Sequence, residues 1–62
     1  MNYAQAIKTL RKKMLLSQTE MAKELGFAFV SINRWENGHC EPTIKAKRKL
    51  AHLFEKYEIE VK

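Results

Sequence analysis

The chain has 62 residues, a net charge of +5 and 45% hydrophobic residues. A chain of this length forms one small domain with one core, and folding buries only about 60% of its unfolded surface. It has no room for a separate catalytic lobe, and we do not expect a deep, water-excluding active site. The positive charge instead indicates a polyanionic partner, either nucleic acid or an anionic membrane surface.

The sequence lacks the residues required for several kinds of functional site and for export or membrane insertion. Cys40 is the single cysteine and cannot form an intramolecular disulfide, and neither it nor His39 has a second ligand pair at zinc spacing. We find no Ser-His-Asp arrangement, phosphate loop or paired carboxylates. We also find no signal peptide and no apolar stretch near the roughly 18 residues of a membrane span. We expect a cytoplasmic, nucleoid-associated protein that is not an enzyme and has no metal, cofactor or membrane segment.

The start of the chain has the spacing of an amphipathic helix. Tyr3, Ile7, Leu10 and Met14 recur at steps of three or four residues, with lysine and arginine between them. Apolar residues at this spacing lie on one face of a helix and can pack against a core. The sequence therefore predicts the first helix here.

A second, short helix is predicted from Ser17 to Gly26. Ser17 and Glu20 have the spacing of a capping box, in which each side chain bonds the backbone N–H of the other residue. Met21 and Leu25 provide the apolar face. Gly26 can adopt the left-handed conformation that ends helices without a steric penalty, so the second helix should end there.

A third helix is predicted from about Ala28 to Glu36, after a short turn. Ile32 and Trp35 have the spacing of an inward face, and Asn37-Gly38 favours the end of the helix. Phe27 is expected to fill the core from the turn. The second and third helices are therefore adjacent and joined by only a few residues.

Thr43 can cap a fourth helix, and the apolar residues after it supply the helix's inward face. These are Ile44, Leu50, Leu53, Phe54 and Tyr57. We expect the core to span about residues 3–57, with 58–62 as a tail in which Glu58 to Val61 is too short for an isolated strand. The sequence predicts a single all-α domain over residues 1–62 with four or five short helices.

Two stretches of this pattern carry a resemblance to a known family. They are Ser-Gln-Thr-Glu-Met-Ala-Lys-Glu-Leu-Gly over residues 17–26 and Ile-Asn-Arg-Trp-Glu-Asn-Gly over residues 32–38, followed by Pro42 and Leu50-Ala51. Together they resemble the phage repressor and Cro-like (XRE-type) helix-turn-helix family, over about residues 7–54. The resemblance implies a lambda-repressor-like helix-turn-helix domain whose third helix enters the major groove of DNA.

The resemblance, with the helical spacing, places four candidate base-contacting residues on the outward face of the third helix. They are Phe29, Val30, Asn33 and Arg34. Arg34 suits the O6 and N7 atoms of guanine, and an exposed Phe29 and Val30 suit thymine methyl groups. Partial burial of Val30 is the alternative for that residue, and a solvated charge is the alternative for Arg34. Asn33 could contact adenine, contact a phosphate or face water.

Other residues are expected to hold the DNA backbone rather than select bases. Helix N-termini and flexible donors suit phosphate. The candidates are Gln18, Ser31, Asn37, Lys45 and Arg48. Gln18 begins the second helix, where the resemblance implies a contact with the backbone or an outer base. Lys47 and Lys49 are expected to form a solvated face instead.

The resemblance also implies that Arg11 on the first helix pairs with Glu36, which would tie that helix to the third. This pair is expected to be structural. Two positions depart from the family pattern. Ala28 stands where a capping Ser or Thr is usual, and Lys47 stands where an apolar residue is frequent. A fifth helix, which many relatives use to close the core and dimerise, is missing unless Ile59 and Val61 replace it.

The expected function is therefore sequence-specific binding of double-stranded DNA by a transcriptional regulator, and specifically a repressor. The partner is expected to be a palindromic operator bound by a weak homodimer. Two alternatives stay open. The same fold could serve as a protein-interaction or antitoxin-like module, with Phe29 and Val30 as its contact surface, or as the DNA-targeting domain of a longer protein.

Overall fold

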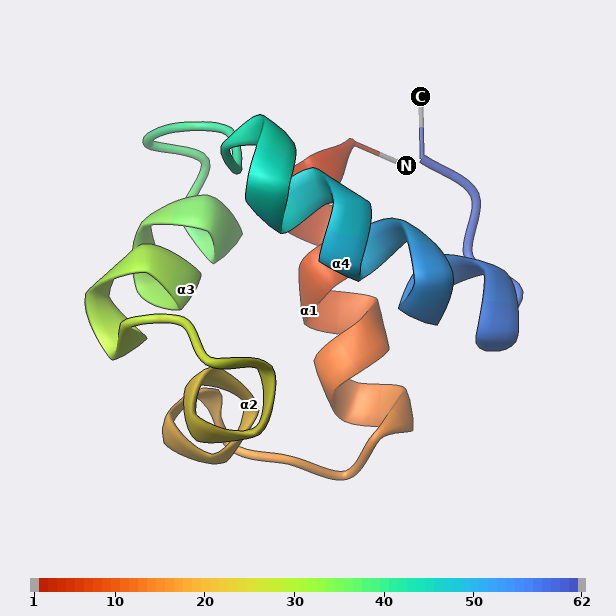
Figure 1. Cartoon of the computed structure of the whole chain (residues 1–62), viewed down its shortest axis with the longest axis horizontal. Helices are drawn as coiled ribbons and strands as arrows, with labels where there is room; N and C mark the ends of the chain where they lie inside the picture. The colour runs from red at the N-terminus through yellow and green to blue at the C-terminus, as the bar shows by residue number, and fades with distance from the viewer. Residues whose placement is uncertain (1, 62) are drawn as a thin grey trace.

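Four helices joined by short loops make up residues 2–61, the part of the chain that the computed structural model describes (Figure 1). They are α1 (Tyr3–Lys13), α2 (Gln18–Leu25), α3 (Phe29–Glu36) and α4 (Ile44–Lys56). Within residues 2–61 there is no strand and no fifth helix. The prediction of an all-α fold with a short second and third helix is confirmed.

The ends of the helices follow from local side-chain chemistry. Ser17 Oγ accepts a hydrogen bond from the Glu20 backbone N–H at 3.1 Å, and Glu20 Oε1 accepts one from the Ser17 N–H at 2.9 Å. This is the predicted capping box. Gly26 ends α2 in the left-handed conformation with φ 75°. Ala28 gives α3 no side-chain cap, whereas Thr43 Oγ1 caps α4 by accepting from the Ala46 N–H at 3.3 Å.

The core lies where all four helices meet. Its fully buried larger side chains are Ile7, Leu10, Met21, Ile32 and Leu50. Phe27 packs against this cluster from the turn before α3, with its ring edge-on to the Trp35 ring at a centroid distance of 5.2 Å. The turn and the inward face of α3 are therefore held by the same aromatic contact, as the sequence predicted for Phe27.

Burial around α4 differs from the prediction in two places. Ile44 was expected in the core, but it is 71% exposed and the core contact at this end of the helix is made by Ala46. The buried residues also extend past residue 57, because Ile59 is only 7% exposed and joins the core after α4 has ended. Lys13 fixes this segment to α1 by donating from Nζ to the Tyr57 carbonyl at 3.0 Å. Ile59 thus closes the core without a fifth helix.

Of the expected solvated face, Lys49 is exposed, whereas Lys47 is half-buried because its side chain folds back onto the protein. Lys47 Nζ lies 3.1 Å from Glu41 Oε1 and 4.8 Å from the centre of the Tyr3 ring. Its aliphatic stem can cover apolar surface while its charge pairs at the rim. A lysine at this position is therefore compatible with packing of α4 on α1.

Candidate nucleic-acid interface

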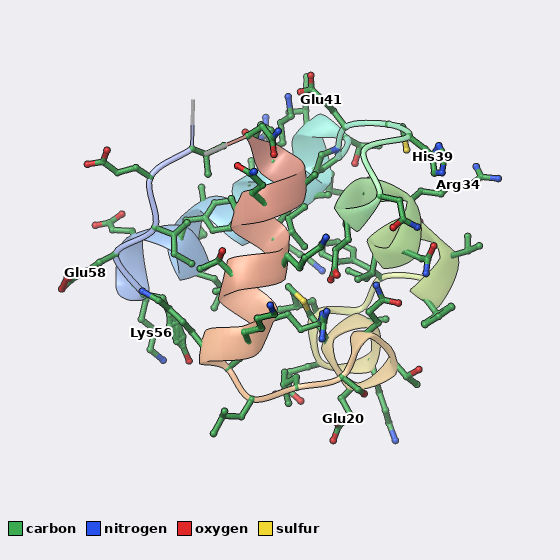
Figure 2. All side chains as sticks on the ribbon, turned by 180° about the vertical axis from the view of Figure 1, so that it is seen from behind. Glu20, Arg34, His39, Glu41, Lys56 and Glu58 are labelled. Carbon is green, nitrogen blue, oxygen red and sulfur yellow. The ribbon has the colours of Figure 1, made fainter. Side chains whose placement is uncertain are left out.

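The outward face of α3 carries the four predicted base-contacting residues. Phe29 is 47% exposed and Val30 is 56% exposed, so neither belongs to the core. Arg34 is exposed, and its side chain points away from the molecule in Figure 2. Its guanidinium makes no hydrogen bond or ion pair with any residue in 2–61. Asn33 is half-buried at the edge of this face nearest α2.

The opposite face of α3 is anchored to α1 by an ion pair. Arg11 Nε donates to Glu36 Oε2 at 2.7 Å, and Arg11 Nη2 donates to Glu36 Oε1 at 3.0 Å. The Arg11 Nη1 atom also donates to the Leu16 carbonyl at 3.3 Å, in the loop before α2. Side-chain exposure is 20% for Arg11 and 2% for Glu36. The pair that the resemblance implied is thus present, two-pronged and largely shielded from water.

Both members of this pair stay charged near neutral pH. Burial by itself raises the pKa of Glu36, but hydrogen bonds from Arg11 and Gln18, with the positive charges of Arg11 and Lys8, outweigh it and leave that pKa below its ordinary value. The hydrogen bond to Glu36 raises the pKa of Arg11. Glu36 is therefore a carboxylate, which accepts hydrogen bonds and donates none.

Hydrogen bonds continue from this carboxylate to the edge of α3. Gln18 Nε2 donates to Glu36 Oε1 at 3.1 Å, Asn33 Nδ2 donates to Gln18 Oε1 at 3.2 Å, and Asn37 Nδ2 donates to Asn33 Oδ1 at 2.8 Å. We call Arg11, Glu36, Gln18, Asn33 and Asn37 the Glu36 network. It brings together two predicted phosphate-contacting residues, one predicted base-contacting residue and the structural pair.

The other edge of α3 borders a depression of about 300 Å³ between α3 and α4. Ser31 and Lys45, both predicted to contact phosphate, line it together. Arg48 lies one turn further along α4, is exposed and does not line it. A larger depression of about 420 Å³, lined in part by Tyr3 and Glu41, contains none of the predicted DNA-contacting residues, so we do not place the interface there.

Lys49 also lines the depression, although it was expected only to belong to a solvated face. Its ammonium donates to the Leu25 carbonyl at 3.1 Å, at the negative end of α2, and lies 5.3 Å from the centre of the Phe27 ring. The only sequence signal was its position four residues after Lys45, which places both on one face of a helix. Two lysines rather than one therefore supply positive charge beside Ser31.

Within residues 2–61, no three side chains of the metal-binding types gather into a group that could hold an ion. None of the four helices has the length and apolar content to cross a bilayer.

Comparison with known proteins gives one family match. A family model described as Helix-turn-helix matches residues 7–61, which include most of α1, all of α2, α3 and α4, and the buried Ile59. Every member of the Glu36 network and of the outward face of α3 lies inside the match. Neither curated proteins nor solved structures gave a significant match.

Proposed function

The chain belongs to the helix-turn-helix family as a DNA-binding transcription regulator of the Cro/C1 (XRE) type, and from this premise we propose that it is a repressor that binds a specific operator through α3. The observation that carries this proposal is the two-sided character of α3. One face is buried and locked to α1, while the other presents the exposed side chains of Phe29, Val30 and Arg34, and the Arg34 guanidinium has no hydrogen bond or ion pair within residues 2–61. A helix anchored in this way can enter a groove about 12 Å wide as a rigid element.

The side chains on the outward face of α3 suit different base edges. The Arg34 fork can donate two hydrogen bonds to guanine O6 and N7. Phe29 and Val30 provide apolar contact for thymine methyl groups. We assign base selection to these residues together with Asn33, whose amide can pair with adenine.

Residues around α3 would hold the phosphates on either side of the groove. On the α4 side we assign Ser31, Lys45 and Arg48 to this role, since a hydroxyl and two exposed cations can approach phosphate oxygens. On the α2 side we assign Gln18 and Asn37, whose amides keep unused donors after forming the Glu36 network. These contacts fix position and carry no base identity.

We further propose that two copies bind a palindromic operator in the nucleoid, with half-sites about 34 to 36 Å apart. The dimer is expected to be weak without DNA and complete on the operator. Analytical ultracentrifugation with and without a selected duplex would measure this. A strict one-to-one complex on an asymmetric site would contradict dimeric binding.

The proposed function is tested first by selecting bound sequences from a random duplex library and then by comparing two variants. Arg34→Ala should lose roughly 1 to 3 kcal/mol on the selected site and little on random duplex, with relaxed preference at one base pair per half-site. Lys45→Ala should weaken binding to both duplexes alike and lower the salt slope by about one unit. Binding isotherms at several salt concentrations separate the two patterns.

An equal loss on both duplexes for Arg34→Ala would contradict guanine contact by this residue. Selectivity would then rest on the other outward residues or on DNA shape. A folded chain that shows no salt-dependent DNA binding would contradict the whole proposal. In that case the exposed Phe29 and Val30 would favour a protein partner, and their replacement by serine should abolish its binding.

A further inference from the structure

We propose that Glu36, although buried away from the outward face, determines which base Asn33 prefers, because it fixes the orientation of two side-chain amides in series. The inference rests on the proposed DNA-binding function and adds a specificity-determining residue that does not touch DNA. It makes Glu36 and Gln18 positioning residues for Asn33, in addition to any contact that Gln18 makes with the phosphate backbone of DNA.

The first step is the orientation of the Gln18 amide. A side-chain amide has a donor nitrogen at one end and an acceptor oxygen at the other, and reversal exchanges them. Glu36 Oε1 lies 3.1 Å from one end of Gln18 and, as a carboxylate oxygen, only accepts. The Gln18 nitrogen must therefore face Glu36, and its oxygen must face the other way.

The second step transfers this orientation to the outward face of α3. The Gln18 oxygen lies 3.2 Å from one end of Asn33, which must be Nδ2 because two oxygens of this kind cannot share a hydrogen bond. Asn33 Oδ1 is then turned toward Asn37, whose Nδ2 donates to it at 2.8 Å. Each amide orientation follows from the preceding one, starting from the carboxylate.

The third step concerns what remains for DNA. After these bonds, Asn33 keeps one N–H donor and one oxygen lone pair. An asparagine pairs with adenine by donating to N7 and accepting from N6. A fixed amide presents its donor and acceptor in one spatial order, and reversal would place the donor opposite N6 and the acceptor opposite N7. Glu36 thus selects the base that the remaining donor and acceptor fit.

The decisive variant is Gln18→Met, which keeps a side chain of similar length, leaves the Arg11–Glu36 pair in place and cuts the connection to Asn33. The base pair contacted by Asn33 is identified first, as the position where Asn33→Ala changes the selected sequence. At that base pair, Gln18→Met should lower the preference at least about fivefold. The preference at the base pair mapped by Arg34→Ala should not change.

Two measurements separate this effect from loss of a backbone contact by Gln18 itself. The matched control Lys45→Ala lies outside the Glu36 network and should leave the preference at both base pairs unchanged. In the Asn33→Ala background, Gln18→Met should weaken all duplexes uniformly and change no preference further. Unaltered preference at the Asn33 base pair in the single variant Gln18→Met would overturn the inference.

The free protein provides a test that does not depend on DNA. The side-chain amide NMR signals of Asn33 should shift and their hydrogens should exchange faster with solvent in Gln18→Met than in the unaltered chain. The double variant Arg11→Met, Glu36→Leu, which removes the accepting carboxylate together with its charged partner, should produce the same change and the same loss of preference. Identical Asn33 signals in all three proteins would overturn the inference, whereas a chain with the shifts but no DNA binding would contradict only the proposed function.

Discussion

The two edges of α3 are built differently. On the edge facing α2, Asn33 and Asn37 are held by hydrogen bonds that lead to a buried ion pair. On the edge facing α4, Ser31 borders an open depression lined by Lys45, an exposed side chain with no hydrogen bond or ion pair within residues 2–61. Ordering such a side chain on binding costs about 0.5 to 1.5 kcal/mol, which a side chain already held does not lose again. The α2 edge is therefore preorganised, whereas the α4 edge can adjust to the path of a phosphate backbone.

The largest expected effect comes from removing the anchor of the preorganised edge. Arg11→Ala leaves Glu36 without its two charged donors in a site where the carboxylate side chain is 2% exposed. We expect a loss of about 3 kcal/mol in the free energy of unfolding. Urea denaturation at neutral pH, followed by circular dichroism, measures it.

A double-mutant cycle shows whether this loss belongs to the pair. Arg11→Ala and Glu36→Ala together should cost clearly less than the sum of the single changes, because either one already breaks the pair. Effects that add within about 0.5 kcal/mol would mean that the α2 edge is not held by this interaction.

Acidification should weaken the same edge without any substitution. The folded-state pKa of Glu36 is lowered despite the opposing effect of burial, so the stabilisation from its charge is present above the unfolded carboxyl pKa of about 4.3 and is lost as the pH falls through the folded value. The urea concentration at the midpoint of unfolding should therefore decrease as the pH is lowered below about 5. Glu20, whose pKa is also lowered by hydrogen bonds with Ser17, contributes in the same direction.

The matched control for this pH dependence is the double variant Arg11→Met, Glu36→Leu. It removes the titrating carboxylate and its partner but keeps Glu20 and the other acids. Its stability should decline less on acidification than that of the unaltered chain. An equal decline would assign the acid sensitivity to surface carboxylates alone.

A smaller effect is expected at the N-terminus of α3, which has no capping side chain. Ala28→Ser should supply the missing acceptor and stabilise the fold by about 1 kcal/mol. Thr43→Ala, which removes the cap that α4 has, should destabilise it by a similar amount. Thermal or urea unfolding of both variants tests the pair. No gain from Ala28→Ser would show that the first turn of α3 is already satisfied in another way.

The smallest effect is expected from Lys49→Met, on the adjustable edge. The change removes the hydrogen bond to the Leu25 carbonyl but keeps an apolar stem over Phe27. Because the group is exposed, we expect a loss of about 0.5 kcal/mol in stability. Binding to selected and random duplexes should weaken equally, and selective loss on one of them would contradict a phosphate role for this side of the interface.

The sequence predicted the features that depend on neighbouring residues. The capping box at Ser17, the end of α2 at Gly26, the inward Trp35 and the exposure of Phe29 and Val30 follow from spacings within one helix or turn. The Arg11 pairing came from the family resemblance. The DNA contacts assigned to these residues stay predictions.

The sequence did not predict features that depend on how helices meet. Ile44 has an apolar side chain, as core residues usually do, but the first turn of α4 directs it outward and Ala46 inward. Ile59 reaches the core because the chain turns back after α4, with Glu58 at φ 57°. Gln18 reaches Glu36 only because α2 and α3 pack against each other. The spacing of the two residues along the sequence does not reveal that their side chains are in contact.

Trp35, whose indole packs against the Phe27 ring, is an internal fluorescence probe. Trp35 is the only tryptophan in the sequence, is 6% exposed and belongs to the buried side of α3. Its emission should move to longer wavelength when urea exposes the indole to water. Docking of the outward face on DNA leaves the indole in the same surroundings, so emission should hold steady through a binding titration. A change during that titration would report movement of α3 relative to the core.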